Sequence, residues 1–308
     1  GFVLILGGAN FMTDGSAAFA KRLGVSDFVI GLTIVSIGTS APEFIVSLLA
    51  AVEGAPSMSI GNIAGSNIFN ILIIIGVVAI LRPIIVPRSV LTGDALWMLI
   101  SSLAILIVGL APELGAGPRI LTRVAALLFV LFFMLFLQNA LSKPAVTSSE
   151  GDTQIKQLPL WRSLLYLLGG LIILVLGGEW FVDGAVGIAH SLGWSEALIG
   201  LTILAVGTSL PELAASVTAA LKGMSGLSVG TVIGSCIFNV FFVLGCAGAI
   251  APMEFGNIGP VDLLVLLVAS VLFLVFGFLF GKKVIKRWEG IVMVIVYLAY
   301  LVYLYANI

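Results

Sequence analysis

The chain has 308 residues, of which 60% are hydrophobic and 9% charged, with a mean hydropathy of +1.25 and a net charge of −1. This composition excludes a soluble globular domain, and we expect no nucleic-acid partner. We expect an all-α integral membrane protein whose main partner is the lipid bilayer. The sequence indicates neither a cofactor nor an obligate protein partner.

Ten apolar segments follow one another, each long enough to cross a hydrocarbon core of about 30 Å. They lie near residues 1–20, 28–52, 57–81, 90–111, 120–141, 160–189, 195–221, 226–250, 260–280 and 288–306. The chain begins at Gly1 rather than Met, so we expect the native chain to start upstream.

Basic residues indicate the orientation of these spans. If the N-terminus is outside, the inner loops hold 12 of the 14 basic residues: Lys21, Arg22, Arg82, Arg88, Lys143, Lys156, Arg162, Lys222, Lys282, Lys283, Lys286 and Arg287. Arg119 and Arg123 are the two exceptions. The positive-inside rule therefore predicts that both termini are outside and that the linker 142–159 is cytoplasmic, in a membrane that we expect to be the prokaryotic cytoplasmic membrane.

The second half of the chain repeats the first. Residues 31–76 align with residues 200–245 without a gap and share 21 identities in 46 positions, and Asp14 matches Asp183 further upstream. Each half holds five spans, so the second copy must enter the membrane from the opposite side. We therefore expect two inverted five-helix repeats, 1–141 and 160–308, joined by the linker 142–159.

The two repeats carry a glutamate at matched positions within apolar segments, Glu43 and Glu212. An acidic side chain at mid-membrane costs about 2.5 to 3.5 kcal/mol, so such residues usually face a cavity and act on ions or substrate. Around each glutamate, residues at helical spacing share one face: Ser36, Ser40 and Ser47 in the first copy, and Ala205, Ser209 and Ser216 in the second. Thr39 and Thr208 flank these stripes. A single hydroxyl is as often structural as functional, but the central glutamate favours function.

Pro42 and Pro211 precede the two glutamates, and a proline removes the helical bond to the carbonyl four residues earlier. We expect the helix to open there and to present backbone oxygen beside a carboxylate, which suits a hard cation. A kink that serves packing alone is the alternative.

The following segment of each repeat adds Ser66 and Asn70, and at the matched positions Ser235 and Asn239. All these candidate ligands are oxygen, which favours Na⁺ or Ca²⁺ over Zn²⁺ or Cu⁺. Mg²⁺ is less favoured because it retains water and demands octahedral geometry.

The paired Gly-Thr-Ser-X-Pro-Glu and Gly-Ser-X-Ile-Phe-Asn blocks resemble the repeats of the sodium/calcium exchanger family, within the calcium/cation antiporters. The resemblance covers nearly the whole chain and implies ten transmembrane helices, with the first and sixth sliding past a core formed by helices 2, 3, 7 and 8.

The resemblance also implies a set of site residues. Glu43 and Glu212, with the carbonyls of Thr39 and Thr208, would bind Ca²⁺. Na⁺ would use the same residues Glu43, Glu212 and Thr208, together with the carbonyls of Ser36 and Ala205 and the hydroxyls of Ser40, Ser66, Ser209 and Ser235. Asn70 and Asn239 would line the middle of the site. Many members carry Asp where this chain has Asn239, and in potassium-dependent relatives that acid is tied to K⁺ transport, so the resemblance argues against K⁺ here.

We therefore predict an antiporter that exchanges Na⁺ for Ca²⁺ by alternating access, electrogenic and independent of K⁺. A proton/calcium exchanger is the alternative, disfavoured by the few titratable groups. A channel would need a multimeric ring of acids, which two repeated copies do not supply. An intramembrane enzyme is disfavoured because the single histidine, His190, lies far in sequence from the repeated serines.

Overall fold

The structure is a computed structural model that describes residues 1–115, 117–142, 158–192, 205–256, 258–280 and 283–306. It divides into two compact units, and each unit draws on both halves of the sequence. Unit 1 comprises Gly1–Pro42 and Lys143–Val232, and unit 2 comprises Glu43–Ser142 and Ile233–Ile308. The division of the sequence into repeats 1–141 and 160–308 and the linker 142–159 therefore describes the chain's internal similarity, and it stays a prediction.

The protein is an all-α membrane protein. In the described part of the chain eight helices are long and apolar enough to cross a membrane, and the bent pair Asp27–Thr39 and Ala41–Val52 makes a ninth. These nine coincide with nine of the ten predicted spans. The remaining one, 195–221, lies partly outside the described residues, and its described part includes the short apolar helix Leu210–Leu221.

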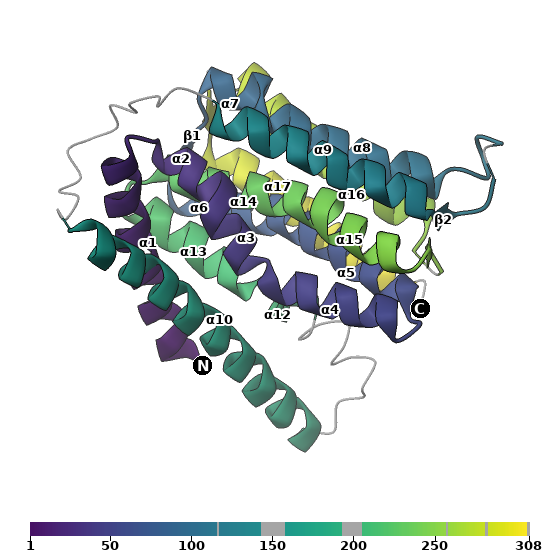
Figure 1. The fold of residues 1–308 in the computed structure, drawn as a ribbon, viewed down its shortest axis with the longest axis horizontal. Coiled ribbons are helices and arrows are strands. Elements are labelled where there is room, and N and C mark those ends of the chain that lie inside the picture. The colour runs from purple at the N-terminus through teal and green to yellow at the C-terminus, as the bar shows by residue number, and fades with distance from the viewer. Residues whose placement is uncertain (116, 143–157, 193–204, 257, 281–282, 307–308) are drawn as a thin grey trace. The chain divides into compact units, whose positions relative to one another are not determined.

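Unit 1 is built around two long helices, α1 (Phe2–Leu23) and α10 (Leu160–Ser191), which pack along each other (Figure 1). Glycines make this close packing possible. A Cβ atom at Gly8 would lie 2.5 Å from the Leu174 nitrogen, and one at Gly170 would lie 2.3 Å from the Met12 nitrogen. Small residues that let backbones approach are the usual contact between membrane helices.

The other elements of unit 1 form the segments around the two repeated motifs. They are α2 (Asp27–Ile30), the π-helical η1 (Gly31–Val35), α3 (Ser36–Thr39), α12 (Ala205–Gly207), α13 (Leu210–Leu221) and most of α14 (Ser225–Ile237). A core of buried apolar side chains joins α1, α10 and α13.

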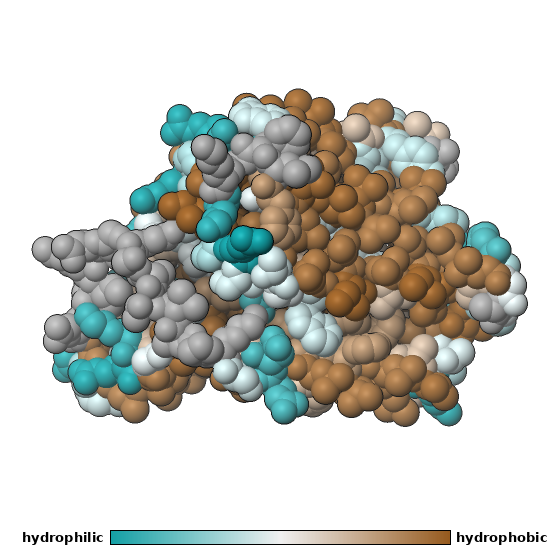
Figure 2. All heavy atoms as spheres, turned by 90° about the horizontal axis from the view of Figure 1, so that it is seen from above, coloured by the Kyte–Doolittle hydropathy of each residue, from teal (hydrophilic) through white to brown (hydrophobic). Residues whose placement is uncertain are grey.

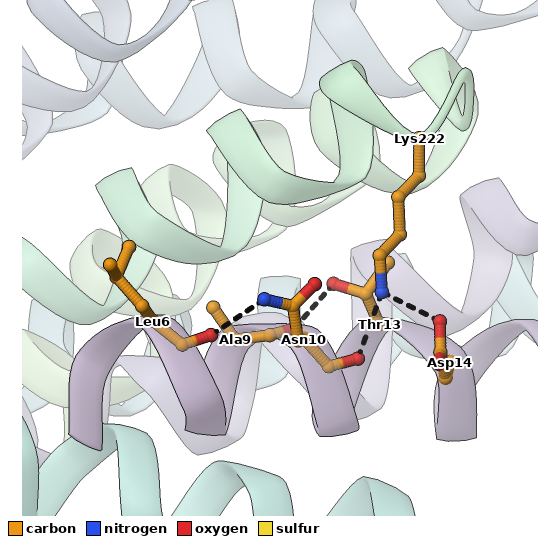
Figure 3. Close-up of polar contacts among 6 residues, drawn as sticks. All are labelled: Leu6, Ala9, Asn10, Thr13, Asp14 and Lys222. Atoms are coloured by element: carbon orange, nitrogen blue, oxygen red, sulfur yellow. Dashed lines mark hydrogen bonds and ion pairs between the residues drawn. The ribbon is translucent and has the colours of Figure 1, made fainter. Parts of the chain in front are cut away.

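One ion pair connects the end of α13 to α1. The Lys222 ammonium lies 2.6 Å from Oδ1 of Asp14 and donates a second hydrogen bond to the carbonyl of Asn10, 3.1 Å away. Figure 3 shows Lys222 reaching down to α1, where Asn10 and Thr13 bond back to their own helix.

Unit 2 holds the remaining helices. They are α4 (Ala41–Val52, from Glu43 onward), α5 (Pro56–Phe69), η2 (Asn70–Ile74), α6 (Ile75–Leu81), α7 (Arg88–Thr92), α8 (Asp94–Gly109), α9 (Arg123–Leu141), η4 (Phe238–Leu244), α15 (Gly245–Ile250), α16 (Pro260–Val275), η5 (Phe276–Phe280) and α17 (Arg287–Ala306). The π-helical segments η2 and η4 begin at or one residue before the repeated asparagines, Asn70 and Asn239. π-Helical turns are rare and are often found at functional sites.

Two short antiparallel strand pairs connect loops of unit 2. β1 (Ile84–Ile85) pairs with β4 (Val284–Ile285), and β2 (Ile120–Leu121) pairs with β3 (Met253–Glu254). The first pair joins two loops that the sequence places inside, and the second joins two loops that it places outside. The pairing therefore agrees with the predicted grouping of these four loops.

The two arginines that depart from the positive-inside pattern both bond to backbone carbonyls. Arg119 donates to the carbonyl of Gly109, 2.9 Å away, and to that of Ile258, and its guanidinium lies 5.7 Å from the Phe255 ring centre. Arg123 donates to the Ile250 carbonyl at 3.2 Å. Arg119 thus joins the end of α8 to the loop that contains Ile258, within unit 2.

Much of the surface is apolar, as lipid contact requires (Figure 2). Exposed apolar side chains include Leu127 on α9, 59% exposed, and Ile295 on α17, 57% exposed. A soluble protein would not expose so many apolar side chains on its helices.

Candidate functional site

Both repeated motifs interrupt their helix at the same serine. Ser40 (φ −84°, ψ 13°) lies between α3 and α4, and Ser209 (φ −90°, ψ 7°) lies between α12 and α13. Pro42 and Pro211 follow two residues later, in the first turn of the next helix, where a missing N–H costs little. The helix therefore breaks two residues before each proline.

Each repeated glutamate is the third residue of the helix that begins after the break, Glu43 in α4 and Glu212 in α13. Both side chains have 0% exposure. The N-terminal turn of a helix carries a partial positive charge that favours a carboxylate. The break thus gives each buried glutamate a favourable electrostatic position that an unbroken helix would not provide.

In unit 1 the Ser40 hydroxyl donates a hydrogen bond of 2.7 Å to Oε1 of Glu212. Ser209 is fully buried and precedes Glu212 by three residues. It is the N-cap residue of α13, but its side chain does not form the capping hydrogen bond. The Thr208 hydroxyl, also at the break, has no hydrogen-bond partner among the described residues. Unit 1 therefore brings Ser40 and Glu212 together, 172 positions apart in the chain.

Ser36 and Thr39 are satisfied within their own helix. Their hydroxyls donate to carbonyls of the preceding turn, at 2.9 Å to Leu32 and 3.0 Å to Val35. The Ser36 carbonyl, predicted as a Na⁺ ligand, accepts the Ser40 N–H at 3.0 Å. Ala205 is the first residue of α12. In this conformation the Ser36 carbonyl is engaged in a backbone hydrogen bond of the helix.

In unit 2 five predicted site residues are buried on α4, α5, α14 and the two π-helical segments: Glu43, Ser66, Asn70, Ser235 and Asn239. Within the described residues, the Ser66 hydroxyl and both amide atoms of Asn70 lack hydrogen-bond partners, as does Oδ1 of Asn239. A buried polar atom without a partner costs about 1 to 3 kcal/mol. These atoms are therefore candidates for binding a ligand, although buried Ser16, Ser59 and Ser228, outside the predicted site, also lack partners among the described residues.

The sequence interpretation missed one residue of this region, Asn67. It is fully buried, its Oδ1 accepts a hydrogen bond of 3.0 Å from Nδ2 of Asn239, and its Nδ2 donates to the Cys236 carbonyl at 2.9 Å. Asn67 lies within the repeated block, but the matched residue is Cys236. Asn67 is therefore not among the polar residues that both repeats share.

The chemistry of these residues suits a hard cation. Among the described residues no group of three or more His, Cys, Asp or Glu side chains could hold a metal ion. The candidate ligands are instead hydroxyl, amide and carboxylate oxygens, the ligands that Na⁺ and Ca²⁺ accept.

Comparison with known families decides the classification. The model of the family described as sodium/calcium exchanger protein matches residues 1–141 and 162–306. The chain belongs to this family. It is therefore a membrane cation antiporter and not an enzyme, and the predicted resemblance is confirmed.

Individual relatives agree with this classification over their full lengths. A putative antiporter CaxA from Alkalimonas amylolytica is 36% identical over 100% of this chain and 97% of its own. The sodium/calcium exchanger MaX1 from Methanosarcina acetivorans is 32% identical, with coverage of 99% and 96%. The solved structure of the sodium-calcium exchanger NCX_Mj matches with a TM-score of 0.85 and 31% identity, over 98% of this chain and 96% of that one. NCX_Mj crystals were also soaked with Na⁺ together with Ca²⁺ or Sr²⁺.

Proposed function

We propose that the protein exchanges Na⁺ for Ca²⁺ across the membrane by alternating access. The observation that carries this proposal is the fully buried glutamate at the start of a broken helix in each repeat, Glu43 and Glu212. Two ionised carboxylates supply the charge that one Ca²⁺ neutralises. Membership of the sodium/calcium exchanger protein family supports the choice of ions.

The proposed ligands follow the repeated motifs. Ca²⁺ binds to Glu43, Glu212 and the carbonyls of Thr39 and Thr208. Na⁺ uses the same glutamates and Thr208 with Ser36, Ser40, Ser66, Ala205, Ser209 and Ser235, and Asn70 and Asn239 line the site. The oxygens of Ser66, Asn70 and Asn239 that lack hydrogen-bond partners within the described ranges support this assignment.

The proposed cycle is electrogenic and independent of K⁺. Three Na⁺ against one Ca²⁺, the ratio that the family resemblance implies, moves one net charge per cycle. Such a charge is worth about 2.3 kcal/mol per 100 mV of membrane potential. Position 239 is an uncharged asparagine, so no third carboxylate is available there to retain K⁺ beside Ca²⁺.

The proposed setting is the prokaryotic cytoplasmic membrane, with both termini outside and the linker 142–159 cytoplasmic. The excess of Lys and Arg in the predicted inner loops supports this orientation.

Transport into reconstituted vesicles tests the proposal. Vesicles loaded with Na⁺ and diluted into Na⁺-free medium should accumulate ⁴⁵Ca²⁺, faster when the inside is held positive, because net positive charge leaves with Na⁺. Uptake should be unchanged when choline replaces K⁺.

A parallel experiment with an outward H⁺ gradient and no Na⁺ distinguishes Na⁺/Ca²⁺ exchange from H⁺/Ca²⁺ exchange. Uptake driven by H⁺ and indifferent to Na⁺ would identify a proton/calcium exchanger. Uptake that ignores a clamped potential would contradict the proposed stoichiometry.

A further inference from the structure

Asn67 is held in one orientation by the backbone. Its Nδ2 lies 2.9 Å from the carbonyl oxygen of Cys236. A backbone carbonyl can only accept a hydrogen bond, so the amide nitrogen of Asn67 must face it. The Oδ1 atom of Asn67 is then turned the other way, toward Asn239.

This orientation dictates that of Asn239. Because Asn67 presents an acceptor, Asn239 must offer its Nδ2 donor, and the two atoms lie 3.0 Å apart. The carbonyl oxygen of Asn239 is therefore directed away from Asn67. That oxygen is fully buried and has no hydrogen-bond partner among the described residues.

The matched asparagine of the other repeat is not held in this way. Both amide atoms of Asn70 lack hydrogen-bond partners within the described part of the chain. The repeat places Cys236 where an equivalent of Asn67 would stand, and a thiol is a weak donor on a shorter side chain. Two identical residues, Asn70 and Asn239, therefore have different surroundings.

We propose that Asn67 is a positioning residue that aims the carbonyl oxygen of Asn239 at the transported cation. This inference rests on the proposed cation exchange and deepens it. The oriented amide supplies a neutral oxygen ligand to Na⁺ or Ca²⁺. The same contact selects an amide at position 239, because an ionised carboxylate there would face the Oδ1 acceptor of Asn67.

A double-mutant cycle tests whether Asn67 acts through Asn239. Asn67→Cys introduces the residue that the chain itself uses at the matched position, and Asn239→Ala removes the amide. Each single variant should raise the half-saturating Na⁺ or Ca²⁺ concentration for ⁴⁵Ca²⁺ uptake by about tenfold, the effect of losing roughly one hydrogen bond. The double variant should show no further rise, because both changes remove the same oriented oxygen.

A control variant separates positioning from stability. Ser102→Ala removes a buried hydroxyl pair with Ser270, 2.8 Å long, between α8 and α16 of the same unit. It should lower the unfolding temperature and leave half-saturation of the folded protein unchanged. If Asn67→Cys behaves like Ser102→Ala, or if the Asn67 and Asn239 effects add, the proposal is overturned.

Exchanging the two residues provides an independent test, which can also be used if the Asn67→Cys variant does not fold. In Asn67→Cys with Cys236→Asn, the new asparagine should hold Asn70, and the coupling should move from position 239 to position 70. Coupling that remains at 239 would contradict the inference.

The wild-type protein tests the proposed exchange separately. If it does not take up Ca²⁺ under a Na⁺ gradient, the exchange function is wrong, whatever the role of Asn67. In that case the same cycle is read from the Ca²⁺-dependent rise in unfolding temperature, which requires no counter-ion. Additive losses in that measurement would overturn the role of Asn67.

Discussion

The Ser40 hydroxyl donates a hydrogen bond of 2.7 Å to Oε1 of Glu212, and both side chains are fully buried. The two residues come from opposite repeats, and each sits at or just after the break in its own helix. A hydroxyl that donates to a carboxylate keeps its oxygen lone pairs available to a cation. The bond to Glu212 is therefore compatible with the proposed role of Ser40 as a Na⁺ ligand.

Replacement of Ser40 by alanine should weaken Na⁺ binding more than Ca²⁺ binding. The change removes a hydrogen bond to a charged group, worth about 1.5 to 3 kcal/mol, and an oxygen that we assign to Na⁺. We expect the half-saturating Na⁺ concentration to rise by at least about tenfold, measured as Na⁺-dependent ⁴⁵Ca²⁺ efflux. Thr33→Val is the matched control, since the Thr33 hydroxyl bonds to its own helix at Val29. Equal effects of the two variants would argue against this role of Ser40.

Substitution of either repeated glutamate by glutamine should nearly abolish transport. A divalent ion in a buried site needs both negative charges, and removal of one partner of a buried charge pair costs about 3 to 5 kcal/mol. We expect ⁴⁵Ca²⁺ uptake to fall by about 100-fold or more in Glu43→Gln and in Glu212→Gln, with the folded yield unchanged. Glu53→Gln, at an exposed position just after α4, should transport normally. Near-normal uptake by either buried variant would refute the assignment.

Single cysteines should reveal the predicted orientation. Ala55 and Ser89 are exposed, and the sequence places Ala55 outside and Ser89 inside. In a background with Cys236 and Cys246 replaced by alanine, an impermeant thiol reagent applied to intact cells should label Ala55→Cys and leave Ser89→Cys unmodified until the membrane is opened. Labelling of both from one side would contradict the orientation.

Loss of the Arg119 side chain should lower stability without changing ion selectivity. Arg119 is half-buried and joins the carbonyls of Gly109 and Ile258, and hydrogen bonds from charged groups contribute about 1.5 to 3 kcal/mol each. We expect Arg119→Gln to lower the unfolding temperature of the detergent-solubilised protein by several degrees. Arg123→Gln, which removes one exposed bond of 3.2 Å, should have a much smaller effect. Equal shifts would contradict this role of Arg119.

The sequence predicted the features that depend on a local pattern. Apolar length determines the spans, and nine of them are present in the described part of the chain. The prolines predict the helix breaks because their missing N–H acts on residues close by in the chain. The buried glutamates follow from their place within apolar sequence, and the shared motifs identified the family.

Contacts between distant residues could not be read from these patterns. The bond from Ser40 to Glu212 depends on how helices from both repeats pack, and the π-helical segments depend on a hydrogen-bond shift that no residue type requires. The role of Asn67 could not be predicted from the repeat for a related reason. The repeat identifies what the two halves share, whereas Asn67 matters because its counterpart, Cys236, differs.

The ion pair between Lys222 and Asp14 is another point at which the halves differ, since the matched residues, Glu53 and Asp183, are both acidic and cannot form an ion pair. An inverted repeat with identical halves would have inward-open and outward-open forms of equal free energy, because each form is the other with the repeats exchanged. Both side chains are about a quarter exposed, at 28% and 24%, so the pair contributes up to about 1 kcal/mol. In the proposed alternating-access cycle, a pair present in only one of the two forms would bias the resting population by up to about fivefold toward that form. The proposed exchanger would then bind its cargo mainly from one side of the membrane, and the opposite form would stay populated enough for reverse exchange when the gradients change.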